Sequence, residues 1–332
     1  MAYTDYMSDE INETQIIPPD DIIESESLNP RSYFNAAVLA IRQKAYKANN
    51  VDWDLILSNT HERVQASHSV GDIHPLIRYV LRALGDDHSH LITPSYGEDI
   101  APEDAPDFGA YITPQGYAYV NVPSCGPAED LGQSYANRIH ENIKRLDEIA
   151  HPTGWIVDMR KNYGGNMWPM IAGLGPLLGN GEHGSFIDSS GKKDSITYIN
   201  GEARYNDEVL NQIDEPYSIE GQPPAIAVLT SKDTASAGEI ALIALLGHEN
   251  VKVFGEATCG VPTANAGISL ADGSTLLVTT SITADRRGRT YSSRIHPDVE
   301  AEIDWENIGN EKDPTLVAAT DWLSSIKTSE SF

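Results

Sequence analysis

The chain has 332 residues, 40% of them hydrophobic, so it can form one large domain or two modest ones around a sizeable core. It contains 23 Lys and Arg against 49 Asp and Glu, and this formal net charge of -26 argues against nucleic acid or an anionic membrane as a partner and favours a cationic peptide. Two cysteines are too few for a disulfide scaffold, and no apolar run reaches the ~18 residues of a membrane span.

The N-terminal part of the sequence changes from polar to helical in character. Residues 1–28 are acidic and lack a periodic pattern, so we expect a flexible tail. They also lack the basic and apolar regions of a signal peptide, which predicts a cytoplasmic location as the sequence stands, or an exported or membrane-anchored one if an N-terminal segment has been removed. Apolar residues at helical spacing then predict three helices, over residues 29–49, 53–64 and 75–84. We therefore expect residues 29–98 to form a helical unit.

The rest of the chain alternates between strands and helices. After a Pro- and Asp-rich link, two short apolar segments around Pro114-Gln115 predict a β-hairpin, which we expect to form a small β cap at residues 99–130. Residues 131–325 would be the core, with a polar surface insertion at 184–222. The strand–helix alternation predicts an α/β core. Helices are expected at 131–149 and 166–178, and strands at 154–157, 225–230, 251–255, 267–270 and 274–283.

The hexapeptide Thr234-Ala235-Ser236-Ala237-Gly238-Glu239 lies between an apolar run and an apolar helical segment. A strand, a tight turn of small residues and a helix can expose one hydroxyl group beside the N–H groups at the start of the helix. Ser236 is therefore the candidate nucleophile. A simpler interpretation is that Thr234 or Ser236 only caps the helix, since hydroxyl residues are favoured there.

A serine nucleophile needs a base, and His88 is the histidine with the most suitable surroundings. It lies in Gly85-Asp86-Asp87-His88-Ser89-His90, just past the end of a predicted helix, where several polar groups can converge on a cleft. The same cluster is also typical of a solvated turn. A third interpretation is a metal site formed by His88 and His90, although the sequence shows no further ligand pattern to complete it.

Two glycine-containing loops complete the set of candidate segments. Gly164 and Gly165 lie in the segment 158–166, between a predicted strand and a predicted helix, where exposed N–H groups could bind an oxyanion. The alternative for this segment is a tight turn braced by an ion pair between Asp158 and Arg160. The second loop, residues 255–262, contains Cys259, a weaker candidate nucleophile because no base lies near it in the sequence.

Taken in order, these segments resemble the tail-specific, or C-terminal processing, serine peptidase family (peptidase family S41). That family has an Asp-x-Arg-x-Asn-x-Gly-Gly loop, matched at residues 158–165, and a nucleophile turn, matched at 234–239. It also has a Gly-Glu-x-Thr-x-Gly loop, matched at 255–260, and a Pro-Asp-Val ending, matched at 297–299. The resemblance covers roughly residues 75–300.

The chain departs from the best-known pattern of the family in two ways. Many members have a Ser/Lys dyad, but the position expected for the lysine is occupied by Val261. Another branch, which includes the nisin resistance proteins and tricorn-like proteases, uses Ser with a His from an Asp-x-His-Ser/Thr step, and Asp86-Asp87-His88-Ser89 matches that step. The chain also has no room for a PDZ domain between His88 and the segment 158–166.

The resemblance implies a ClpP/crotonase-like α/β core and a serine endopeptidase that cleaves a peptide near its C-terminus, with no cofactor. In this interpretation His88 takes the proton of Ser236, and the N–H groups of Ala237 and of Gly164 or Gly165 bind the oxyanion. The imidazole would be oriented by Glu239, by Asp86 or by an acid from residues 285–298, and Asn166 and Met167 would contact substrate. The substrate would be a peptide or protein, and we expect a small, cationic or modified peptide. The alternatives are an inactive, ligand-binding relative and a metal-dependent hydrolase that uses His88 and His90.

Overall fold

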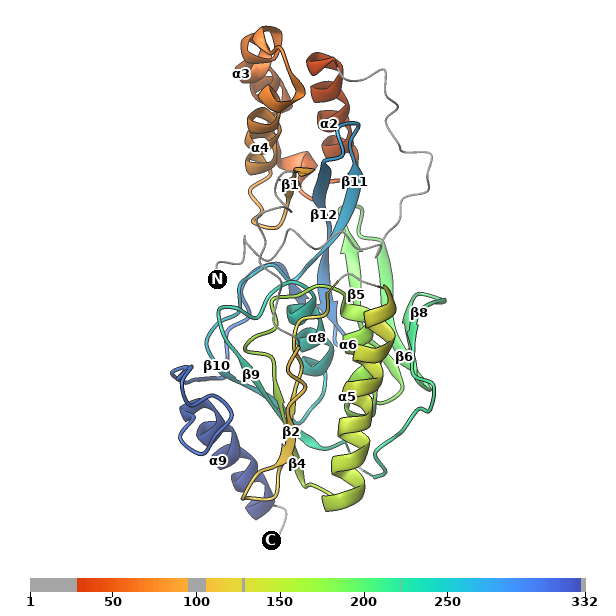
Figure 1. Cartoon of the computed structure of the whole chain (residues 1–332), viewed down its shortest axis with the longest axis vertical. Helices are drawn as coiled ribbons and strands as arrows, with labels where there is room; N and C mark the ends of the chain where they lie inside the picture. Colours follow the sequence, from red (N-terminus) through yellow and green to blue (C-terminus); the bar gives the residue numbers. More distant parts are fainter. Residues whose placement is uncertain (1–28, 95–105, 127–128, 222, 330–332) are drawn as a thin grey trace.

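The computed structural model describes residues 29–94, 106–126, 129–221 and 223–329 (Figure 1). The acidic tail expected at residues 1–28 and most of the Pro- and Asp-rich link, at 95–105, lie outside the described residues. Within the described ranges, none of the helices combines the length and the apolar character needed to cross a bilayer.

The N-terminal helices pack together and against a distant strand. They are α2 (Pro30–Lys44), α3 (Trp53–Ala66) and α4 (His74–Ala83), with short 3₁₀ turns at Ala48–Asn50 and Val70–Asp72. Helix α2 begins as predicted, because the side chain of Asn29 accepts hydrogen bonds from the N–H groups of Arg31 and Ser32. The buried faces of the helices share a hydrophobic cluster with Leu276 and Val278, which lie far along the chain.

The core contains a six-stranded sheet in the order β14-β10-β9-β4-β3-β2. Its neighbouring strands are parallel except for β2, which pairs antiparallel with β3 at one edge. The strands are β2 (Ala110–Ile112), β3 (Ala118–Asn121), β4 (Gly154–Asp158), β9 (Ala225–Thr230), β10 (Val251–Gly255) and β14 (Val299–Glu300).

Helices cover both faces of this sheet, which explains why β4 and β9 are buried along their whole length and consist mainly of apolar residues. Val157 and Val228 share a hydrophobic cluster with α5 (Glu129–Ala150), α6 (Met167–Gly173) and α8 (Ala237–Leu246). On the other face, Ile156 and Leu229 pack with α9 (Pro314–Ser329), which lies at the end of the molecule away from α2–α4 (Figure 1). The expected α/β core is therefore confirmed.

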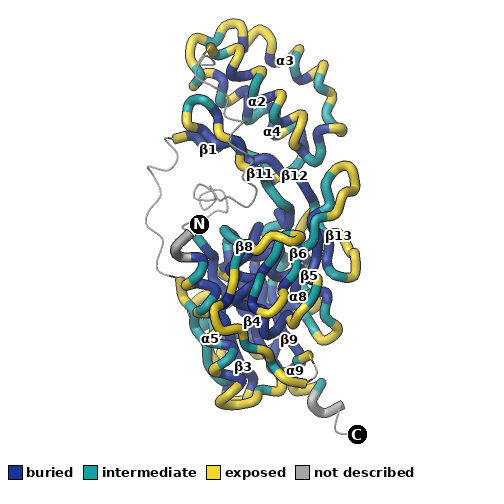
Figure 2. Tube along the Cα trace, turned by 90° about the vertical axis from the view of Figure 1, so that its right-hand side faces the viewer, coloured by how far each residue is buried: buried dark blue, intermediate teal, exposed yellow. Residues whose placement is uncertain are grey.

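A second sheet connects the core to the N-terminal helices. It has the order β1-β12-β5-β6-β7-β8, with β11 and β13 also paired to β12. Strand β12 is 11 residues long and runs from the helical unit into the core, so that buried residues continue between the two parts (Figure 2). The strands are β1 (His90–Ile92), β5 (Gly181–Asp188), β6 (Lys193–Ile199), β7 (Glu202–Tyr205), β8 (Glu208–Gln212), β11 (Thr263–Ser269), β12 (Thr275–Asp285) and β13 (Thr290–Tyr291).

Two expectations about the sheets are wrong. Residues 184–222 are not a surface insertion, because they supply most of β5 and all of β6 to β8, and β5 pairs with β12 in the middle of the second sheet. Their polar composition reflects the exposed side of antiparallel strands. The hairpin at residues 110–121 is also not a separate cap, because β3 pairs in parallel with β4 and so extends the six-stranded sheet.

Candidate active site

The three glycine-containing segments singled out in the sequence meet at one edge of the six-stranded sheet. Each follows the end of a parallel strand: Asp158 ends β4, Thr230 ends β9 and Gly255 ends β10. In parallel α/β sheets, ligands bind outside the carboxyl ends of the strands. The topology therefore places all three segments where a site is expected.

Hydrogen bonds hold these loops against one another. The N–H of Ala235 donates to the carbonyl of Asn162 at 2.9 Å, and the hydroxyl of Thr234 donates to the carbonyl of Met159 at 2.9 Å. The third loop is attached through the N–H of Cys259, which donates to the carbonyl of Thr234 at 2.9 Å. The loops around Asn162, Thr234 and Cys259 thus form one connected structure.

Ser236 occupies the N-cap position of α8, but not in the usual conformation of a cap. Its φ is 49° and its ψ is -118°, whereas N-cap residues normally have extended backbone angles. Positive φ is costly for a residue with a side chain and persists where the surroundings enforce it, often at functional sites. The residue is 7% exposed. This conformation is that of a strained turn between a strand and a helix, which favours the nucleophile interpretation over a simple cap.

Glu239 anchors this turn. Its carboxylate accepts hydrogen bonds from the N–H groups of Ser236 at 3.1 Å, Gly260 at 3.0 Å and Val261 at 2.8 Å, and from the hydroxyl of Thr258 at 2.5 Å. Glu239 is fully buried. The carboxylate therefore connects the nucleophile turn to the loop after β10. We assign Glu239 to this connection and not to the expected orientation of the imidazole.

His88 lies just before β1 and is 2% exposed. Its Nδ1 is hydrogen-bonded to Oγ1 of Thr263 in β11 at 2.7 Å. The carboxylate of Asp86, another expected partner of the imidazole, instead accepts from the backbone N–H groups of His88 at 3.1 Å and Ser89 at 2.6 Å. Asp86 therefore shapes the turn, and the ring partner at Nδ1 is a threonine that the sequence analysis did not identify.

The acids expected from residues 285–298 have other partners. Oδ2 of Asp285 accepts from Nε of Arg289 at 2.7 Å. Asp298 accepts from the N–H of Val253 at 2.8 Å and so attaches the loop before β14 to β10. We therefore assign neither of them to the orientation of His88.

A short chain of hydrogen bonds connects Thr263, the partner of His88, to Ser236. The N–H of Thr263 donates to the carbonyl of Val261 at 2.8 Å. The N–H of Val261 donates to the same Glu239 oxygen that accepts from the N–H of Ser236. Val261 occupies the position of the lysine in the Ser/Lys pattern. In this chain, that position is part of the hydrogen-bonded connection between Ser236 and His88.

The residues expected to donate to the oxyanion lie in different surroundings. The N–H of Gly164 donates to the side chain of Asn162 at 3.0 Å, so Gly164 is not a suitable donor. Gly165 forms a parallel bridge with Cys125, and in this geometry its own N–H points away from Cys125. Gly165 has a φ of 98°, and a Cβ there would lie 1.9 Å from the carbonyl oxygen of Cys125. Ala237 is the first residue of α8, where an N–H has no partner within the helix.

The two residues expected to contact substrate have structural roles in this conformation. The side chain of Asn166 caps α6 by accepting from the N–H of Trp168 at 3.0 Å. Met167 is 4% exposed and belongs to the main hydrophobic core. The side chain of Met167 thus faces the core, and the expected contact of this residue with substrate stays a prediction.

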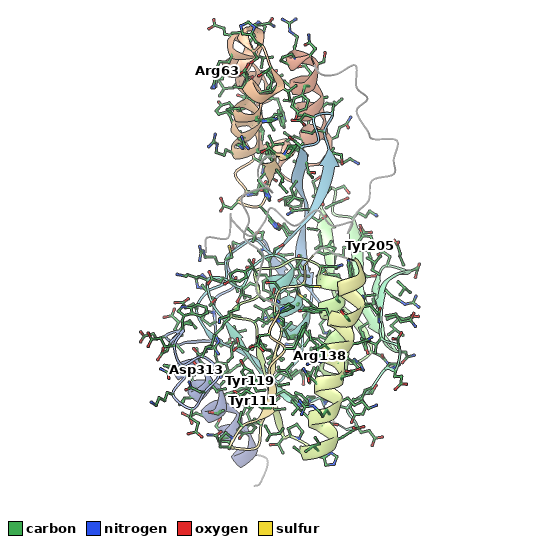
Figure 3. All side chains as sticks on the ribbon, viewed as in Figure 1. Arg63, Tyr111, Tyr119, Arg138, Tyr205 and Asp313 are labelled. Carbon is green, nitrogen blue, oxygen red and sulfur yellow. The ribbon has the colours of Figure 1, made fainter. Side chains whose placement is uncertain are left out.

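The predicted ion pair between Asp158 and Arg160 is present, and it has a third member. Nη2 of Arg160 lies 2.6 Å from Asp158 and 2.7 Å from Asp313, and all three side chains are buried. The hydroxyl of Tyr119 also donates to Asp158 at 2.6 Å. Tyr119 and Asp313 are labelled in Figure 3. Asp313 directly precedes Pro314, a sequence signal for a helix start, but nothing local indicates its contact with Arg160.

The alternative chemistries receive less support from the geometry. Burial and the nearby carboxylate of Glu239 raise the pKa of the Cys259 thiol to about 12, which makes it a poor nucleophile at neutral pH. Nδ1 of His90 is hydrogen-bonded to the carbonyl of His88 at 2.9 Å. Among the described residues, no three His, Cys, Asp or Glu side chains are placed to share a metal ion.

We predict that Thr263 positions His88. Replacing Thr263 by valine should lower kcat/KM for a peptide about 10- to 100-fold, the effect of losing one hydrogen bond to a group that becomes charged. The loss should appear in kcat, with little change in thermal stability, and Thr263→Ser should restore most of the activity. A loss of stability equal in Thr263→Val and Thr263→Ser, or unchanged kcat in Thr263→Val, would contradict this role.

The pH dependence of activity should reflect Glu239 and not His88. Burial, with a contribution from His90, lowers the pKa of His88 to about 3, so the imidazole is neutral and able to accept a proton throughout the neutral range. Burial raises the pKa of Glu239 to about 7 against the effect of its four donors. As pH falls through about 7, Glu239 becomes protonated and the nucleophile turn loses a hydrogen-bond acceptor. We therefore expect kcat/KM to fall. Glu239→Gln should be less active and lack this pH dependence; a wild-type profile that is flat from pH 5 to 8 would contradict the assignment.

Comparisons with known proteins give the family and the fold of the chain. A sequence model described as peptidase family S41 matches residues 116–301, more than half of the chain. The nisin-resistance protein of Lactococcus lactis subsp. lactis is 27% identical over 278 residues, covering 82% of this chain and 83% of that protein. The model's range includes Ser236 and all three loops, whereas His88 precedes it.

Solved structures share the fold. A structure of a lipoprotein from Streptococcus agalactiae has a TM-score of 0.71 at 25% identity, covering 90% of this chain and 96% of that one. The photosystem II D1 C-terminal processing protease has a TM-score of 0.60 at 15% identity, covering 87% and 97% respectively. The mixed α/β architecture with N-terminal helices is therefore one that C-terminal processing proteases also have.

Proposed function

Because the chain belongs to peptidase family S41, we propose that it is a serine endopeptidase in which Ser236 and His88 form a catalytic dyad. The observation that carries the proposal is the strained turn at Ser236. Glu239 connects this turn to the loop before β11. Thr263, at the start of β11, is the hydrogen-bond partner of His88. Acyl transfer requires a nucleophile and a base. Here the nucleophile lies at the start of a helix, and the base is a buried neutral imidazole in the same hydrogen-bond network.

The proposed reaction has two steps. With Nδ1–H of His88 donating to Thr263, Nε2 accepts the proton of Ser236 as Oγ attacks the substrate carbonyl. The oxyanion accepts hydrogen bonds from the N–H groups of Ala237 and Gly165, each worth about 3 kcal/mol in comparable hydrolases. His88 then gives the proton to the leaving amine, and a water molecule, activated by the same imidazole, releases the acyl group from Ser236.

The ion pairs and glycines have a supporting role in this proposal. Arg160, with its two carboxylate partners, fixes the loop that carries Gly165. Gly238 lets that loop approach α8, because a Cβ at Gly238 would lie 2.6 Å from Oδ1 of Asn162. The core would be ClpP/crotonase-like, with residues 29–98 acting as a helical unit that supplies the base to the protease core at 131–325.

We propose a small cationic peptide as the substrate, cut near its C-terminus and bound in extended form by addition to a strand edge. The charge of -26 supports attraction of a cationic peptide. A relative that aligns over most of its length is named for resistance to nisin, so nisin is the first peptide to test. The similar streptococcal lipoprotein supports the exported or membrane-anchored alternative for where this activity takes place.

The proposal is tested by incubating the protein with nisin and with cationic and anionic peptides of equal length, with and without a chelator, and by identifying the fragments by mass spectrometry. We expect one cut near the C-terminus of a cationic peptide, unaffected by chelator and absent in Ser236→Ala. Binding without cleavage would favour the inactive, ligand-binding alternative. Cleavage that the chelator abolishes would favour the metal-dependent alternative.

A further inference from the structure

A cavity of about 930 Å³ lies at the opposite edge of the six-stranded sheet from the candidate active site. It is lined by Thr153 and Ala225, next to the first residue of β4 and at the first residue of β9, and by Leu323 of α9. The loops of the candidate active site follow the other ends of these same strands. Nothing in the proposed peptidase mechanism uses this cavity, so its polar lining needs a separate explanation.

Arg286, which lines the cavity just after β12, is held in place by a buried histidine. Its Nη2 donates to Nδ1 of His183, and Nε2 of His183 is hydrogen-bonded to the carbonyl of Gly179 at 2.9 Å. Because a guanidinium group only donates, Nδ1 of His183 must be the acceptor and Nε2 must carry the hydrogen. His183 is therefore a neutral residue that orients Arg286.

Arg286 has no carboxylate partner among the described residues. None of the ion pairs found there includes Arg286 or its neighbour Arg287. Nε of Arg286 is buried and makes no hydrogen bond in the described part of the chain. The adjacent Asp285 is engaged by Arg289 and by the hydroxyl of Tyr291. Arg286 thus brings to the cavity a guanidinium group that no carboxylate of the described residues neutralises.

His248 adds a neutral imidazole to the lining of the same cavity. Its ring stacks on that of His183, with 6.0 Å between the ring centroids. Nε2 of His248 is buried and has no hydrogen-bond partner in the described ranges. Burial, Arg286 and Arg287 lower the pKa of His248 to about 4, so its ring is neutral near pH 7.

A structural role explains the neighbouring arginines but not Arg286. Nε of Arg287 donates to the carbonyl of Gly247 at 3.0 Å, and Nη2 of Arg289 donates to that of Leu246 at 3.2 Å, so these two cap the end of α8. Arg286 instead packs over Gly247, where a Cβ would lie 2.2 Å from its Cγ.

The remaining charges in the cavity restrict the ligand. Asp147, Glu220 and Glu249 line it together with Arg286 and Arg287, so acidic groups outnumber the two arginines. A dianion such as phosphate would be repelled by these three carboxylates. A molecule with one carboxylate and one ammonium group can satisfy both kinds of charge.

We propose that this cavity binds a short peptide with free termini, whose carboxylate is bound by Arg286 and His248 and whose ammonium group is bound by the acidic residues. The planar guanidinium group of Arg286 matches a carboxylate in shape. The binding does not depend on the peptidase activity, because the cavity and the candidate active site lie at opposite ends of β4 and β9.

The proposal is tested by isothermal titration of tetra-alanine with free termini into the Ser236→Ala protein, which cannot cleave it by the proposed mechanism. Adding Arg286→Gln should weaken binding about tenfold or more, as expected for a hydrogen-bonded charge. The matched control is Arg63→Gln, which makes the same charge change on exposed α3, far from the cavity (Figure 3). If Arg286→Gln proves unfolded by its melting curve, His248→Gln replaces it, with a weakening of about threefold or more expected.

Titrations with modified peptides and with phosphate test which groups of the ligand the cavity binds. We expect the C-terminal amide and the N-acetylated form of tetra-alanine to bind more weakly than the form with free termini. Inorganic phosphate that binds more tightly than the peptide, in a manner dependent on Arg286, would replace the proposal with a simple anion site. Absence of peptide binding, or equal binding by the two arginine variants, would overturn it. Because all titrations use Ser236→Ala, failure here leaves the proposed peptidase function untouched.

Discussion

Replacing Ser236 by alanine should lower the kcat for peptide hydrolysis about 10⁴-fold or more, because the residual reaction would depend on substrate binding and oxyanion stabilisation alone. His88→Ala should cause a loss of similar size, and the double variant should be no worse than either single variant, since the two groups act as a unit. Rates are measured with the peptide that the wild-type protein cuts best.

Two exposed residues of α3 provide matched controls for these variants. Ser58→Ala and His61→Ala remove the same side chains at solvent-exposed positions and should leave kcat within about twofold of the wild type. Unfolding in urea should show that all five variants are folded. Additive losses in the double variant, or a Ser236→Ala protein with more than about a tenth of wild-type activity, would contradict the dyad.

Removing Arg160 should cause the largest loss of stability. Its guanidinium group is fully buried and makes hydrogen bonds of 2.6 to 3.1 Å with Asp158 and of 2.9 Å with Asp313. Arg160→Met would leave two buried carboxylates without their cation, so the free energy of unfolding should fall by about 3–5 kcal/mol. Urea unfolding followed by circular dichroism measures the change.

The arginine prediction also has a matched control. Arg138 is exposed on α5 (Figure 3), and Arg138→Met should change the free energy of unfolding by less than about 0.5 kcal/mol. Adding Asp313→Asn to Arg160→Met should recover part of the lost stability, because it removes one of the two uncompensated charges. If Arg160→Met costs less than about 1 kcal/mol, the three charges do not stabilise the loop as described.

Local sequence signals were sufficient to find the loops and the strands of the core. Small residues between an apolar run and a helix marked the turn at Ser236, and mainly apolar runs marked β4 and β9 because helices cover both of their faces. The family match over 116–301 confirms the resemblance that the order of these motifs suggested.

Contacts that depend on tertiary structure could not be predicted in the same way. Thr263 meets His88 only because β1 and β11 both pair with β12, and no local pattern indicates this. Gly164 was expected as a donor, but the side chain of Asn162 already accepts its N–H. The segment 184–222 looked like an insertion because one side of its strands is polar, although the strands belong to the second sheet.

The central claim, that His88 activates Ser236 as a nucleophile, is tested most directly by labelling with a fluorophosphonate probe and identifying the modified residue by mass spectrometry. We predict that the wild-type protein is labelled on Ser236, with or without a chelator, and that Ser236→Ala and His88→Ala are not labelled. A wild-type protein that resists the probe while showing a chelator-sensitive peptidase activity, or a label that persists in Ser236→Ala, would contradict the account.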